Sequence, residues 1–277
     1  MRIRANTRGA ATPRPSTWHD AGVVAVLSVS LCGVLALTAH TDPLALAAGV
    51  AVAQLVLAGA VFQSPAVPAP RTAALVVAAG GLAATALMTW PDVLSGFNGS
   101  HAGDSARLSG GTLMGLAPGA AVVVVGAVVR EMFRRGRRTY LTASIAGTVT
   151  IGAWSVLLAA WVAAAKTDEG DEIVLVAAAA VALASLMWSL PGPRGLIGPL
   201  GVIVGAAAGS AARMASETPL DIPVAVGLAV FAALLAVSGR AIASTLAVDP
   251  ARRLPVDAVL PLVLVGPIAF WTGQLLV

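Results

Sequence analysis

The 277-residue sequence carries few charges for its length, and this limits the environment in which it can fold. Hydrophobic residues make up 58% and charged residues 11% of the chain, whereas soluble domains have about 25% charged residues. Most of such a chain must be surrounded by lipid. The formal net charge of +4 comes from arginines in the gaps between apolar runs rather than on one stripe, so the pattern argues against nucleic-acid binding.

Nine apolar stretches, taken in chain order, predict nine transmembrane helices. A helix needs about 20 apolar residues to cross the bilayer core, and only a helix pairs all its backbone groups there. The sequence therefore predicts an all-α integral membrane protein, with a basic segment at 1–20 and a single membrane domain at 21–277. The predicted spans are 21–39, 43–61, 72–89, 111–129, 140–165, 172–190, 195–212, 219–239 and 255–276.

Two alternatives would change this count. The stretches 195–212 and 219–239 could form one re-entrant unit, although both are uncharged through their middles. The stretch 21–39 follows an arginine-rich segment, as the core of a cleaved signal peptide does, but it is longer than the 7 to 15 residues, roughly, of such a core. We therefore expect the first helix to be retained.

The distribution of charge predicts the orientation. Fourteen of the seventeen basic residues precede the first span or lie between spans 2–3, 4–5, 6–7 and 8–9, whereas the other gaps hold only Arg107, Lys166 and Arg213. Because basic residues are retained on the cytoplasmic side, we expect a cytoplasmic N-terminus and an external C-terminus. The use of Arg over Lys, together with abundant Ala, Val and Gly, is typical of a GC-rich bacterium and suggests its plasma membrane.

Similar short sequences recur in the two halves of the chain and suggest an internal duplication. Ala-His-Thr-Asp at 39–42 matches Ala-Lys-Thr-Asp at 165–168, and Pro-Ala-Pro-Arg at 68–71 matches Pro-Gly-Pro-Arg at 191–194. Four spans per copy would make the copies parallel. The alternative is that Pro and Arg simply suit short turns. The predicted units are repeat 1 at about 21–130, repeat 2 at about 140–240 and an extra helix at about 255–276.

The candidate polar residues within the predicted spans are uncharged. No ionisable residue lies near the middle of any span, which argues against a proton relay through side chains. The residues predicted to line a substrate path are Gln54, Thr148, Thr150 and Gln274. Hydrogen bonding between helices is the alternative role for each of them.

Small residues and prolines predict how some helices pack or bend. Pro118, Pro261 and Pro267 suggest that the fourth and ninth spans are kinked or unwound. A glycine ridge in the seventh span predicts close helix packing within the bundle, with self-association as the alternative. The ridge consists of Gly201, Gly205 and Gly209.

Neither metal nor cofactor binding is predicted. Asp92, His101 and Asp104 in the 91–110 loop match no ligand spacing, and Cys32 is the single cysteine. A basic cytoplasmic loop either serves only to orient the chain or contacts anionic lipid headgroups or another membrane subunit. Its arginines are Arg134, Arg135, Arg137 and Arg138.

Three classes of function remain after these exclusions. A small permease or exporter of a neutral or amphipathic substrate fits the short loops and the suggested repeats. A non-catalytic accessory or scaffold subunit fits the lack of charge within the spans. A lipid-modifying enzyme is the third class, although the sequence contains no nucleophile elbow, phosphate-binding loop or zinc-binding helix. A polar cavity would favour transport, a solid apolar bundle a scaffold, and clustered acidic or histidine side chains an enzyme.

The arginine distribution predicts the outcome of a topology experiment. A reporter fused after Val277 should read external, and one inserted between Arg134 and Arg138 should read cytoplasmic. Paired phosphatase and fluorescent-protein fusions measure both positions. A cytoplasmic reading at Val277 would contradict the odd number of spans.

Overall fold

The structure is a computed structural model. It describes residues 18–62, 69–90, 115–134, 141–167, 169–216, 220–245 and 250–275, except for the side chains of 18–20 and 250–253. The predicted 91–110 loop and three of the predicted contact residues, Arg135, Arg137 and Arg138, lie outside these ranges.

The described residues form helices and no strands. Among the described residues, nine helical segments are long and apolar enough to cross a membrane, and α6 and α7 together make up one of them, Leu141–Ala165. This confirms an all-helical architecture of the multi-pass type. The helices are α1 (Trp18–Ala39), α2 (Pro43–Phe62), α3 (Pro70–Thr89), α5 (Leu116–Phe133), α6 (Leu141–Leu157), α7 (Ala160–Ala165), α8 (Gly170–Trp188), α9 (Arg194–Ala215), α10 (Ile222–Thr245) and α11 (Pro250–Leu275).

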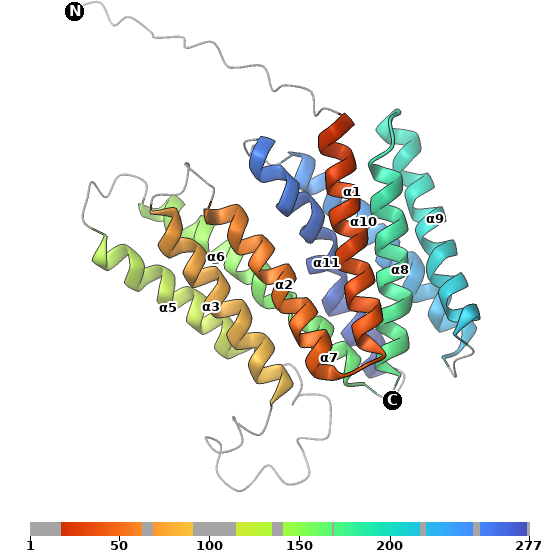
Figure 1. Ribbon diagram of the computed structural model, residues 1–277, viewed down its shortest axis with the longest axis horizontal. Coiled ribbons are helices and arrows are strands. Elements are labelled where there is room, and N and C mark those ends of the chain that lie inside the picture. The colour runs from red at the N-terminus through yellow and green to blue at the C-terminus, as the bar shows by residue number, and fades with distance from the viewer. Residues whose placement is uncertain are drawn as a thin grey trace, which may run out of the picture.

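The spans form two groups that meet along a seam (Figure 1). The first group contains α2, α3, α5 and α6, and the second contains α8, α9 and α10. Helices α1, α7 and α11 contact helices of both groups and lie along the seam. We call the end of the bundle where α2 meets α3 and α8 meets α9 the arginine-rich end.

The outer surface of the bundle is apolar, as contact with lipid requires. Leu75 on α3, Ile203 on α9 and Phe231 on α10 are 60% or more exposed. Since such side chains would be unfavourable in water, the bilayer accounts for their position. The interior is also apolar, so the helices are hydrophobic on nearly all sides.

The predicted four-plus-four repeat is not confirmed by the packing. In the first group, α3 is central and packs on α2, α5 and α6. Its counterpart in the second group, α9, packs mainly on α8 and α10 and lies at the edge of the bundle (Figure 1). The two groups therefore differ in which helix occupies the centre.

The glycine ridge of α9 faces its neighbours inside the bundle. A Cβ atom added at Gly205 would lie 2.7 Å from the Ala180 carbonyl oxygen of α8 and 2.8 Å from Ala233 Cβ of α10. One turn away, a Cβ at Gly209 would lie 2.7 Å from Ala229 Cβ. The absence of side chains allows three helix backbones to approach closely, which is how helices associate in lipid.

Two helices continue past the predicted ends of their spans and include a buried arginine. The predicted fourth and eighth spans end at 129 and 239, but α5 continues to Phe133 and α10 to Thr245. Arg130 and Arg240, which were predicted to lie in loops, are therefore helical residues, and both are buried. A hydropathy criterion ends a span at its first charge, whereas the helix itself continues until its backbone hydrogen bonds stop.

The prolines do not unwind these helices. The prediction of a kinked or unwound helix is wrong for α5, and the prediction of an unwound helix is wrong for α11. Pro118 lies in the first turn of α5, where a helix needs no backbone N–H donor. Helix α11 is continuous although Pro255, Pro261 and Pro267 lie inside it. Each proline removes one donor, so the carbonyl four residues earlier loses its usual helical partner.

Replacing Gly205 with Leu should destabilise the protein. The added side chain would push α9 away from α8 and α10, and overpacking of this kind costs about 1–3 kcal/mol. The matched control is Gly227→Leu, because a Cβ at Gly227 meets nothing within 4 Å. Thermal unfolding in detergent should show a lower midpoint for the first variant only. Equal midpoints would mean that the ridge does not hold these helices together.

Candidate functional site in the broken fifth span

The fifth span, predicted as one helix over 140–165, is broken in its C-terminal third. Helix α6 ends at Leu157 and α7 begins at Ala160. The Ala159 amide donates to the Val156 carbonyl at 3.0 Å, whereas a continuous helix would direct it to the Ser155 carbonyl. Since the break contains neither Gly nor Pro, its cause must be tertiary rather than local.

Gln54 of α2 provides the missing donor. Its Nε2 donates to the Ser155 carbonyl oxygen at 3.0 Å and to the Gly81 carbonyl oxygen of α3 at 3.1 Å. It also lies 2.8 Å from Thr85 Oγ1. Gln54 is fully buried, and an unpaired carbonyl in the bilayer core would cost several kcal/mol. One amide group thus joins α2, α3 and α6 at the level of the break.

Two polar atoms beside this amide have no partner among the described residues. They are Gln54 Oε1 and Ser155 Oγ, and both residues are 0% exposed. A buried polar atom without a hydrogen bond costs about 1–3 kcal/mol. A Cβ added at Gly81 would overlap Ser155 Oγ, so the α3 backbone packs directly against this hydroxyl. These atoms are an acceptor and a hydroxyl that another group can satisfy.

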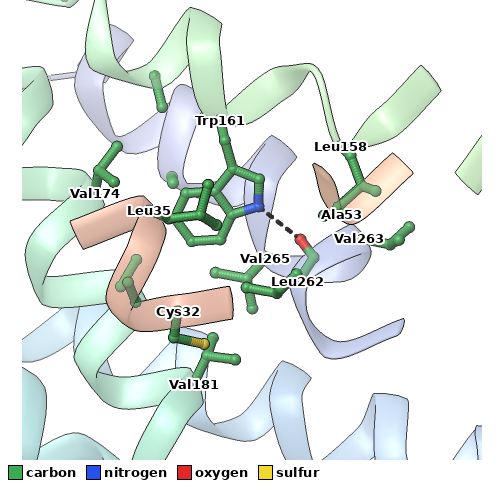
Figure 2. Close-up of a cluster of buried hydrophobic side chains, with 14 of the residues drawn as sticks. Cys32, Leu35, Ala53, Leu158, Trp161, Val174, Val181, Leu262, Val263 and Val265 are labelled. Carbon is green, nitrogen blue, oxygen red and sulfur yellow. Dashed lines mark hydrogen bonds between the residues drawn. The ribbon is translucent and has the colours of Figure 1, made fainter. Parts of the chain in front are cut away.

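Trp161 fixes the other side of the break to α11. Its side chain is 0% exposed, and its Nε1 donates to the Leu262 carbonyl oxygen at 2.9 Å (Figure 2). Gly266 allows the indole to lie close, because an added Cβ there would be 3.0 Å from Trp161 Cδ1. A buried indole N–H needs such an acceptor. The break is therefore held from two sides, by Gln54 and by Leu262.

Apolar side chains fill the seam around Trp161. Figure 2 shows Leu35 and Cys32 of α1 on one side of the indole and Val265 of α11 nearby. Leu35 and Cys32 are each 1% exposed and Val265 is fully buried. In this state the seam is closed by packed side chains, and the polar groups lie in the adjoining first group.

The predicted path residues do not lie together. Gln54 lies at the break, but Thr148 binds Arg130 near the arginine-rich end, with its Oγ1 3.0 Å from Arg130 Nη1. Thr150 is exposed on the outer surface of α6, and Gln274 is half-buried at the far end of α11. The structure instead adds Thr85, Ser155 and Trp161 to Gln54. Hydropathy gives no signal for these three residues, because hydroxyls and tryptophans are common in spans.

A buried ion-pair network lies at the arginine-rich end of the first group. Arg130 Nη1 lies 3.2 Å from Glu131 Oε1, and Arg134 Nη1 lies 2.9 Å from Glu131 Oε2. Ser144 of α6 donates to Glu131 Oε1 at 2.6 Å. Arg134, one of the predicted contact arginines, thus binds within its own chain. In the sequence, the adjacent opposite charges of Arg130 and Glu131 were the only indication of this ion-pair network.

In the second group, a buried arginine binds a carbonyl that a proline leaves without its helical donor. Pro261 has no N–H, so the Asp257 carbonyl loses its helical partner. Arg240 Nη1 donates to this oxygen at 3.0 Å, and Arg240 Nη2 donates to Ser189 Oγ at 2.8 Å. Arg240 therefore joins α10 to both α11 and α8.

The site at the break offers neutral hydrogen bonding and no charge. Within the part of the chain that the structure describes, no three His, Cys, Asp or Glu side chains are placed to hold a metal ion. Asp92, His101 and Asp104 lie outside that part. The available groups are an amide, two hydroxyls and backbone carbonyls.

Comparison with models of known protein families, with curated proteins and with solved structures gives no match for this chain. Function must therefore be argued from the geometry of the site and from the multi-pass architecture alone.

Proposed function

We propose that the protein is a small permease or exporter that moves a neutral or amphipathic substrate across a bacterial plasma membrane, with its N-terminus in the cytoplasm. The observation that supports this most is the pair of unsatisfied polar atoms beside a broken span, Gln54 Oε1 and Ser155 Oγ. Transporters place substrate sites at such breaks, where freed backbone and side-chain polar groups meet near the bilayer midplane.

Movement at this site would bend a turn held by i→i+3 hydrogen bonds, from Ala159 to Val156 at 3.0 Å and from Trp161 to Leu158 at 3.2 Å, whose geometry is poorer than that of α-helical bonds. The helical bond between Ala159 and Ser155 is already absent, so α7 can rotate against α6 without losing it. Trp161 ties α7 to α11, and both lie along the seam between the helix groups. If the groups separate, α7 and α11 move together while Gln54 stays with α2 and α3. The substrate would then take the place of the lost contacts.

The chemistry of the site selects the class of substrate. Gln54 Oε1 accepts a hydrogen bond and Ser155 Oγ can donate or accept, so a hydroxyl or amide group fits both. A charged group would find no counter-ion there. The same composition predicts that transport does not depend on a proton relay through side chains.

The closed apolar seam favours a second candidate, a non-catalytic accessory subunit of a membrane complex. Leu35, Trp161 and Leu262 fill the seam and are each at most 1% exposed. A scaffold needs only such a solid bundle, and it would give no flux. A lipid-modifying enzyme receives no comparable support from the described residues.

Flux measurements on proteoliposomes separate these candidates. Entry of urea, followed by light scattering, and flipping of a fluorescent diacylglycerol, followed by dithionite quenching, test a small and an amphipathic neutral probe. We expect faster movement of at least one probe than in empty liposomes, and no effect of a proton gradient. Gln54→Leu should slow it about fivefold, since one neutral hydrogen bond contributes about 1 kcal/mol.

Thr150→Val is the matched control, because Thr150 is exposed on the outside of α6; it should leave the flux unchanged. A cooperative thermal transition of the Gln54 variant, at a lower midpoint because buried carbonyls lose their donor, would confirm that it still folds. Absence of flux for both probes would favour the accessory subunit, and strict proton coupling would refute the proposed mechanism.

A further inference from the structure

At the arginine-rich end, the described parts of the two Pro-x-Pro-Arg turns both place an arginine over an aromatic ring, although the backbone before that arginine differs between them. The φ angle of the middle residue is 50° at Ala69 and 153° at Gly192. The arginine that follows lies over the aromatic ring that ends the preceding helix: Arg71 over Phe62 at 6.0 Å and Arg194 over Trp188 at 4.9 Å. We call these places the α2 corner and the α8 corner.

A buried arginine from a later helix reaches each corner. At the α2 corner, Arg130 of α5 donates through Nε to Thr72 Oγ1 at 3.1 Å. At the α8 corner, Arg240 of α10 donates through Nη2 to Ser189 Oγ at 2.8 Å. Each arginine also binds the next span, α6 in the first case and α11 in the second. The two corners can therefore be compared group by group.

The two corners differ in whether a carboxylate directly contacts the buried arginine. Glu131 follows Arg130 and contacts it directly, so the α2 corner contains its own carboxylate. Ala241 follows Arg240, and the Arg240 guanidinium binds the carbonyl rather than the carboxylate of Asp257. That carboxylate still attracts Arg240 electrostatically. The Arg240 charge is therefore already partly neutralised by Asp257. An additional anion at the α8 corner would provide the direct contact with the guanidinium that the Asp257 carboxylate does not make.

Two buried donors at the α8 corner have no partner among the described residues. They are Arg240 Nε and Ser185 Oγ, on residues that are 5% and 0% exposed. Ser185 lies one helical turn from Ser189, on the same face of α8. The exposed Arg194 binds the Trp188 carbonyl oxygen at 2.5 Å, beside Ser189. Two guanidinium groups and two hydroxyls therefore gather at the end of α8.

We propose that the α8 corner binds the phosphate of an anionic phospholipid from the adjacent leaflet. Arginine pairs well with phosphate oxygens, and basic pockets between spans bind phospholipid headgroups. The surrounding surface favours a lipid over free phosphate, because Leu186, Leu190 and Leu196 are 40%, 45% and 71% exposed. These leucines can contact acyl chains while the headgroup reaches the arginines. The bound phosphate takes the place that Glu131 occupies at the α2 corner.

Native mass spectrometry of the full chain in detergent tests the site. The probes are phosphatidylglycerol, phosphatidylcholine and inorganic phosphate. We expect one phosphatidylglycerol to be retained in preference to phosphatidylcholine, with no competition from inorganic phosphate at equal concentration. Arg194→Gln and Arg240→Gln should each weaken retention about tenfold, because a charge-assisted hydrogen bond contributes about 1.5–3 kcal/mol. Arg71→Gln, at the α2 corner, is the matched control and should leave retention unchanged.

A second variant keeps the test independent of whether Arg240→Gln folds. Ala241→Glu places a carboxylate after Arg240 as Glu131 follows Arg130, and should displace the lipid while preserving the fold. Retention unchanged in both Arg194→Gln and Ala241→Glu would overturn the proposal, as would equal retention of phosphatidylcholine. Efficient competition by inorganic phosphate would overturn the claim that the ligand is a phospholipid rather than free phosphate. None of these outcomes depends on transport.

Discussion

The bilayer requires that each backbone group released from helical bonding finds a partner within the protein. The fifth span shows the consequence: the Ser155 carbonyl, freed at the break, accepts a hydrogen bond from Gln54. The same rule applies in α11, where Arg240 binds the Asp257 carbonyl that Pro261 leaves without a helical donor. These side chains join helices that would otherwise be held only by packing.

Packing supplies the rest of the cohesion, and it depends on small residues. Lipid offers helices no hydrophobic reason to associate, so backbones must approach closely, as α9 does against α8 and α10 at Gly205. In the described ranges, charged side chains lie toward the arginine-rich and the opposite ends of the helices, and the interior offers neutral hydrogen bonds near Gln54. This arrangement suits a substrate without charge. It also separates the proposed transport site from the proposed phospholipid site at the end of α8.

The sequence predicted the spans well because apolar length is a strong and local signal. It predicted Gln54 as a candidate but not its partners, since contacts among α2, α3 and α6 depend on tertiary packing. The break at Leu158 and Ala159 was missed because both residues favour helix. Thr148 and Thr150 were grouped by sequence, yet residues two apart on a helix point about 200° apart, so only Thr148 faces the interior. Arg130 and Arg240 were placed in loops because hydropathy treats a charge as the end of a span.

Amide hydrogen exchange in lipid nanodiscs tests most directly whether side chains replace the lost helical bonds. In the natural protein, amides at 157–163 should exchange slowly. In Gln54→Leu, the Ser155 carbonyl loses its donor, so exchange at 157–163 should increase while exchange at 201–209 in α9 stays the same. Unchanged exchange at 157–163, or an equal increase throughout the bundle, would contradict a break that Gln54 holds in place.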